Sequence, residues 1–71
     1  MKEALIYRRT EAKLTQEQVA TVLCIDRSTI SKWETGEAAP KTAMLPRLAA
    51  LYKCSIADLY TVPKKGDTMK G

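Results

Sequence analysis

The sequence predicts an all-α fold, and three observations support this prediction. Apolar residues recur at three- and four-residue steps through the first 60 residues, whereas no run of strict alternation is long enough for a strand. Nine of the hydrophobic residues are alanines, so the core must be built from small, closely packed side chains, which suits helices. At 71 residues, the chain has room for one small domain.

The first two helices are predicted from apolar faces and from one capping motif. In a helix over about residues 2–13, the inward side would carry Leu5, Ile6, Arg9 and Ala12. A second helix begins sharply at Thr15, whose hydroxyl can accept a backbone N–H bond. Gln18, three residues later, can return the second bond of a capping box.

A third helix follows after a short interruption. Cys24 and Ile25 break the helical pattern, and Asp26 is a suitable N-cap for a helix over residues 27–34. Gly36 stands where a glycine commonly ends a helix. The second and third helices are therefore joined by a turn of about three residues, which is the spacing of a helix-turn-helix.

Two further helices complete the predicted domain. The fourth is expected to start near residues 43–45, because Pro46 is tolerated in a first turn but not in a helix interior. Ser55 caps a short fifth helix over residues 56–60. Beyond this, the composition turns polar and basic, which predicts a domain over residues 1–62 and a disordered basic tail over residues 63–71.

Composition excludes several kinds of chemistry. The chain has no histidine, and Cys24 and Cys54 are far apart with no further ligands spaced around them, so we expect neither a metal site nor another cofactor. The candidate nucleophiles Ser28, Ser31 and Cys24 have no evident base, which argues against an enzyme. The longest stretch without a charge, residues 18–25, is far shorter than the roughly 20 residues that cross a bilayer.

We therefore expect a protein of the reducing cytoplasm, with no membrane partner. No run long enough for a signal-peptide core is present near the N-terminus. We also expect no sensor domain and no small-molecule ligand.

Charge supports nucleic-acid binding through its placement rather than its total. The chain carries a net charge of +4, but half of the excess lies in residues 61–71. The segment over residues 15–36 has a net charge of −1, from Arg27 and Lys32 against Glu17, Asp26 and Glu34. A general basic attraction to phosphate is therefore a poor argument for this chain.

The third helix divides into an apolar face and a polar face. Ile30 and Trp33 fall on one side, and Arg27 lies in the exposed first turn. The opposite side carries Ser28, Ser31, Lys32 and Thr35. These are hydrogen-bond donors, and an α-helix fits the major groove, where arginine and lysine can bond guanine. An ordinary solvated face is the alternative for the helix taken alone.

The run LTQEQVATVLCIDRSTISKWETGEAAP, Leu14 to Pro40, resembles the helix-turn-helix of the Cro and phage-repressor family, the XRE-type regulators. The run MLPRLAALYKCSIADL resembles the fourth and fifth helices of that family, so the likeness covers Leu5 to Leu59. The resemblance implies a five-helix, lambda-repressor-like DNA-binding domain. Its second and third helices would form the helix-turn-helix.

The resemblance also implies roles for single residues. Base contacts would come from Arg27, Ser28, Ser31 and Lys32. Contacts with the DNA backbone would come from Gln16, Thr35 and Lys41. Glu34 would form a structural ion pair with Arg9, and the core would hold Trp33, Val19, Ala20, Leu23, Ile25, Ile30, Leu45, Leu48 and Leu59.

Cys24 departs from the family pattern. The family usually has glycine at this turn, often with a positive φ, so a side chain here costs about 1–2 kcal/mol if the conformation is kept. We expect both Cys24 and Cys54 to be small buried hydrophobic residues.

The expected function is that of a sequence-specific DNA-binding transcriptional regulator, acting as a repressor on an operator in double-stranded DNA. One recognition helix reads few base pairs, so we expect a homodimer on two half-sites. Ile56, Tyr60 and Val62 are candidates for the two-fold contact, although they could instead pack the fifth helix on the first. The alternative function is a helix-turn-helix protein-interaction module, such as an antitoxin or an anti-repressor partner.

Overall fold

A computed structural model describes residues 1–63, and within them the chain forms α-helices and 3-10 helices but no strand. The α-helices are α1 (Lys2–Glu11), α2 (Gln16–Leu23), α3 (Arg27–Thr35) and α4 (Leu45–Tyr52). Two 3-10 helices follow α3 and α4, namely η1 (Thr42–Met44) and η2 (Ala57–Leu59). The all-α prediction is confirmed for this part of the chain. The tail expected over residues 63–71 lies outside it, apart from its first residue.

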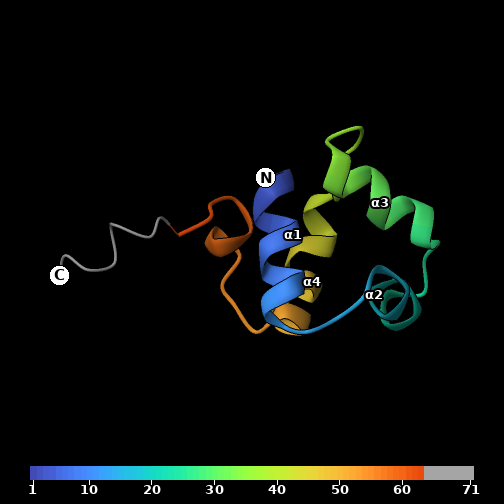
Figure 1. Ribbon diagram of the computed structural model, residues 1–71, viewed down its shortest axis with the longest axis horizontal. Helices are drawn as coiled ribbons and strands as arrows, with labels where there is room; N and C mark the ends of the chain where they lie inside the picture. Colours follow the sequence, from blue (N-terminus) through green and yellow to red (C-terminus); the bar gives the residue numbers. More distant parts are fainter. Residues whose placement is uncertain (64–71) are drawn as a thin grey trace, which may run out of the picture.

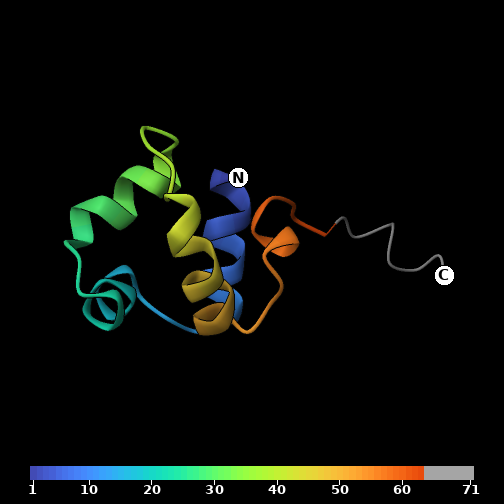
Figure 2. The same ribbon diagram turned by 180° about the vertical axis from the view of Figure 1, so that it is seen from behind.

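The helices pack around a core at the centre of the molecule. In both ribbon views α1 and α4 lie side by side, with α2 and α3 beyond them on one side and η2 on the other (Figures 1 and 2). The largest side chains that are fully buried between these elements are Leu5, Val19, Ile30, Leu48 and Leu59. Each α-helix thus supplies at least one fully enclosed residue.

Most of the predicted core is confirmed. Val19, Ala20, Leu23, Ile30, Trp33, Leu45, Leu48 and Leu59 are all buried. Ile25 is only half-buried and packs against the edge of the core. The inward position predicted for Ile6 is wrong, since this residue is 39% exposed. Helix α1 instead turns Ala4 and Leu5 inward, and Ile6 lies about 100° further round the helix.

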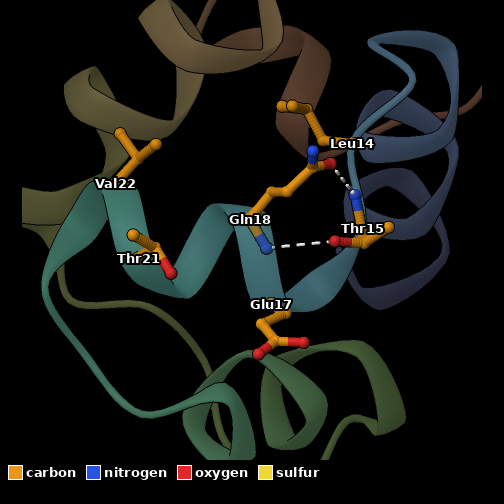
Figure 3. Close-up of a pocket in the computed structure, with 6 residues that line it drawn as sticks. All are labelled: Leu14, Thr15, Glu17, Gln18, Thr21 and Val22. Atoms are coloured by element: carbon orange, nitrogen blue, oxygen red, sulfur yellow. Dashed lines mark hydrogen bonds between the residues drawn. The ribbon is translucent and has the colours of Figure 1, made fainter.

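The start of α2 has the predicted capping box. The backbone N–H of Gln18 donates to Thr15 Oγ1 over 3.0 Å, and the backbone N–H of Thr15 donates to Gln18 Oε1 over 2.8 Å (Figure 3). These two bonds satisfy two of the N–H groups that a helix start leaves without partners. They fix the point at which the chain enters the helix-turn-helix.

Helix α2 ends in a left-handed residue, Cys24, with φ 59° and ψ 43°. The N–H groups of Cys24 and Ile25 donate to the carbonyls of Thr21 and Ala20, which is the Schellman pattern of a helix end. The expected burial of Cys24 is wrong, because its thiol is exposed. Cys24 therefore lies outside the face of α2 that packs in the core.

Cys24→Gly is expected to raise the free energy of unfolding by about 0.5–1 kcal/mol. Glycine removes the left-handed strain of about 1–2 kcal/mol, while its greater freedom in the unfolded chain offsets part of this gain. Urea denaturation measures the change. Thr21→Gly, at an exposed interior position of the same helix, is the control and should lower stability by about 0.3 kcal/mol. A loss of stability in Cys24→Gly would contradict the prediction.

The ends of α3 agree only in part with prediction. Asp26 occupies the N-cap position with an extended backbone, but its side chain makes no capping bond. At the other end, Gly36 adopts φ 89°, a conformation that glycine takes without strain. A Cβ at Gly36 would also come within 2.9 Å of Lys2 Cδ.

The start of α4 at Leu45 agrees with the predicted start near residues 43–45, whereas the fifth element is shorter than predicted. Pro46 is the second residue of α4, where its missing N–H costs nothing. Ser55 and Asp58 exchange reciprocal bonds of 3.1 and 3.2 Å, so the predicted cap is present. The fifth helix expected over residues 56–60 is a single 3-10 turn, closed by a bond from the Tyr60 N–H to the Ala57 carbonyl.

Candidate nucleic-acid interface

Helix α3 has one face held in the core and the other open to solvent. Ile30 is fully buried and Trp33 is 6% exposed, so the helix cannot rotate about its axis without opening the core. On the outer side Arg27, Ser28 and Lys32 are exposed. Ser31, the fourth predicted base-contact residue, is half-buried. The structure thus exposes three of the four predicted base-contact residues, and the fourth, Ser31, is partly covered.

The turn between α2 and α3 is short. Three residues, Cys24, Ile25 and Asp26, separate the end of α2 from the start of α3, and the two helices pack against each other (Figure 1). A turn of this length between two packed helices is the geometry of a helix-turn-helix, in which the second helix is presented outward.

The three residues predicted to contact the DNA backbone have different environments. Thr35 is exposed, and its hydroxyl donates to the Lys32 carbonyl over 3.2 Å and accepts from the Glu37 N–H over 3.4 Å. Lys41 is exposed in the loop after α3. Gln16, the first residue of α2, is half-buried, and its amide is already bonded within the protein.

A buried ion pair joins α1 to α3. Arg9 Nε donates to Glu34 Oε2 over 2.7 Å, and Arg9 Nη2 donates to Glu34 Oε1 over 3.1 Å. The Glu34 side chain is 5% exposed. A third donor of the guanidinium, Nη1, reaches the Leu14 carbonyl over 2.8 Å. Hydrogen bonding to Glu34 raises the pKa of Arg9, which therefore keeps its charge.

Sequence reasoning missed two contacts of this framework. Gln16 Nε2 donates to Glu34 Oε1 over 2.9 Å. Arg8 donates to the carbonyl oxygen of Asp58 over 3.2 Å and lies 3.6 Å from its carboxylate, which ties α1 to η2. Both contacts join residues distant in the chain, so only the packing of the helices brings them together. For the bond between Gln16 and Glu34, the sequence offered only one signal, which was a polar residue at the first position of α2.

The buried Tyr52 phenol should make the free energy of unfolding depend on pH in the alkaline range. Burial, assisted by the negative charge of Glu34, raises the pKa of the Tyr52 phenol well above its ordinary value. Above about pH 10 the unfolded chain releases a proton that the folded chain keeps. The free energy of unfolding should therefore fall as the pH rises through about 10. Urea titrations between about pH 9 and 11 should show this fall, and Tyr52→Phe should reduce it. An unchanged pH dependence in Tyr52→Phe would contradict the assignment.

The surface beside α2 has a hollow of mixed polar and apolar lining. The hollow beside α2 drawn in Figure 3 is lined by one carboxylate, one amide, two hydroxyls and two apolar side chains. Within residues 1–63 no group of three or more His, Cys, Asp or Glu residues is placed to hold a metal ion. In the same residues, no helix has the length and apolar character needed to cross a membrane.

Comparison with known proteins identifies the family. A family model described as helix-turn-helix matches residues 5–59. The chain is 39% identical over 57 residues to the HTH-type transcriptional activator BcrR of Enterococcus faecalis, an alignment that covers 80% of this chain and 28% of that relative. The chain therefore spans less than a third of the relative's length. No solved structure gives a significant match. The chain belongs to the XRE-type helix-turn-helix family of DNA-binding transcriptional regulators.

Proposed function

We propose that this protein binds a specific operator by inserting α3 into the major groove. The observation that carries the proposal is the fixed orientation of α3, in which buried Ile30 and Trp33 turn Arg27, Ser28 and Lys32 outward. Arginine and lysine at such positions can donate to guanine O6 and N7, and serine hydroxyls can bond to base edges. Ser31, which is half-buried, would be a further base contact.

Backbone contacts would set the position of α3 without reading sequence. Thr35 is the last residue of α3, Lys41 lies in the loop that follows, and Gln16 is the first residue of α2. The capping box uses the N–H groups of Thr15 and Gln18, so the start of α2 keeps further N–H groups that can donate to a phosphate. Backbone contacts from both helices would hold α3 in its position in the groove.

We further propose a homodimer on two half-sites about one helical turn apart. Ile56, Tyr60 and Val62 are 41%, 51% and 37% exposed, which gives the η2 end of the molecule an apolar surface. Sedimentation with and without a palindromic duplex tests this. Two copies per duplex are expected, and a one-to-one complex on a duplex with both half-sites would contradict the dimer.

The proposed effect on transcription is repression, because a domain bound across a promoter blocks the access of polymerase. The proposed location of the protein is the cytoplasm. The relative from Enterococcus faecalis is named as an activator, so the sign of regulation needs its own test. A reporter gene carrying the selected operator across its promoter should lose expression when the protein is present. A gain of expression would assign activation instead.

Selection of bound fragments from random duplex DNA, followed by a salt titration, tests the proposed binding itself. We expect an enriched motif with two half-sites, and an affinity that falls steeply as salt increases because phosphate contacts release counterions. Weak binding that is equal for selected and random duplexes would contradict specific recognition. It would favour a protein-interaction module.

A further inference from the structure

Glu34 accepts one hydrogen bond more than its ion pair requires. Arg9 alone reaches both oxygens of the carboxylate, over 2.7 and 3.1 Å. Gln16 adds a third bond, from its Nε2 to Oε1 over 2.9 Å. Gln16 is half-buried at the first position of α2, whereas Glu34 is buried in α3. The bond therefore connects the buried ion pair to Gln16, which is itself one of the proposed DNA-backbone contacts.

The third bond determines how the Gln16 amide is presented. An amide nitrogen carries two hydrogens, and Glu34 takes one of them. Within the described residues, the second N–H and the amide oxygen of Gln16 have no protein partner. A bond to a carboxylate is stronger than one between neutral groups, so it can hold the side chain in one rotamer before any ligand arrives. A side chain already held does not lose rotamer freedom on binding.

We infer that Glu34 is a positioning residue for DNA binding, which acts by holding the Gln16 amide ready to donate its second N–H to the DNA backbone. The inference rests on the proposed function. It gives the carboxylate a role separate from its pairing with Arg9, which ties α1 to α3 whether or not DNA is bound. The two roles predict different results when Glu34 and Gln16 are changed together.

A double-mutant cycle on DNA affinity separates the roles. Wild type, Gln16→Met, Glu34→Gln and the double variant are titrated onto one selected duplex at fixed salt, at a temperature where all four are folded. Gln16→Met should weaken binding about tenfold, the size expected for one charge-assisted hydrogen bond. Glu34→Gln should weaken binding by a similar factor in the wild-type background, but less than about twofold in the Gln16→Met background. Equal factors in both backgrounds would overturn the inference.

Lys41 supplies the matched control for the cycle. It is exposed and makes no hydrogen bond with Glu34. The losses from Glu34→Gln and Lys41→Ala should therefore multiply. Coupling of the same size in this pair would show that Glu34→Gln acts on the whole interface rather than through Gln16.

NMR of the free wild-type protein tests the inference even if Glu34→Gln fails to fold. The side-chain couplings of Gln16 should report a single rotamer, and one of its amide hydrogens should exchange slowly. Gln18, two residues along α2, is the internal control for hydrogen exchange, because its amide oxygen accepts a bond while its Nε2 donates none within the described residues. Rotamer averaging at Gln16 would overturn the inference. If wild type selects no duplex, the proposed function fails, while the NMR result still reports on the amide.

Discussion

Arg9→Met is expected to lower the free energy of unfolding by about 3 kcal/mol, because it leaves the Glu34 carboxylate buried without its cation. A small domain has a total stability of only about 5–15 kcal/mol, so the loss should be visible as a large fall in melting temperature. The same substitution frees the Leu14 carbonyl before α2 and so loosens the entry to the helix-turn-helix. Urea denaturation followed by circular dichroism measures the change.

Two controls show whether the effect comes from the unpaired carboxylate. Arg9→Met combined with Glu34→Leu should recover much of the lost stability, because the buried charge is then removed as well. Arg8→Met removes a cation from the neighbouring position of α1, where the partner Asp58 is 42% exposed, and should have only a small effect. Equal losses in Arg9→Met and Arg8→Met would contradict the importance of burial.

Arg27→Ala and Lys32→Ala should each weaken binding to the selected operator by about 1–3 kcal/mol, which is roughly 5- to 150-fold. Both side chains are exposed, so the melting temperature should hardly change. Each substitution should also relax the preference at the base pair that its side chain contacts. Fluorescence anisotropy on the selected duplex and on single-base variants measures both effects.

Lys41→Ala is the matched control for these base contacts. As a backbone contact it should weaken binding to all duplexes alike and reduce the salt slope by about 1. If Arg27→Ala and Lys32→Ala also lowered affinity by the same factor for selected and random duplexes, their assignment to base recognition would be wrong.

Local signals predicted the helix boundaries well. The Thr15 and Gln18 capping box, the position of Pro46 and the glycine after α3 each depend on residues a few positions apart, so they can be read from the chain itself. Periodicity alone could not choose between the adjacent apolar residues of α1. Ala4, Leu5 and Ile6 cover most of the circumference of the helix, and the packing partners of α1 decide which of them is buried.

The candidate site was predictable in its residue types but not in its internal contacts. The donors on α3 follow from helical spacing, because Ile30 and Trp33 define the opposite face. The bond between Gln16 and Glu34 joins residues 18 positions apart and exists only because α2 and α3 cross where they do. The exposure of Cys24 likewise depends on a backbone reversal that a hydrophobicity pattern does not contain.

The placement of α1 and α4 between the helix-turn-helix and η2 has a consequence for operator choice (Figures 1 and 2). In the proposed homodimer, two copies meeting at the η2 ends would hold their α3 helices apart by the combined width of these two helices in each copy. The packing of α1 and α4 would then set the spacing between the half-sites, whereas α3 would recognise only the base sequence within each half-site. Core substitutions in α1 or α4 could thereby change operator spacing without touching a base contact.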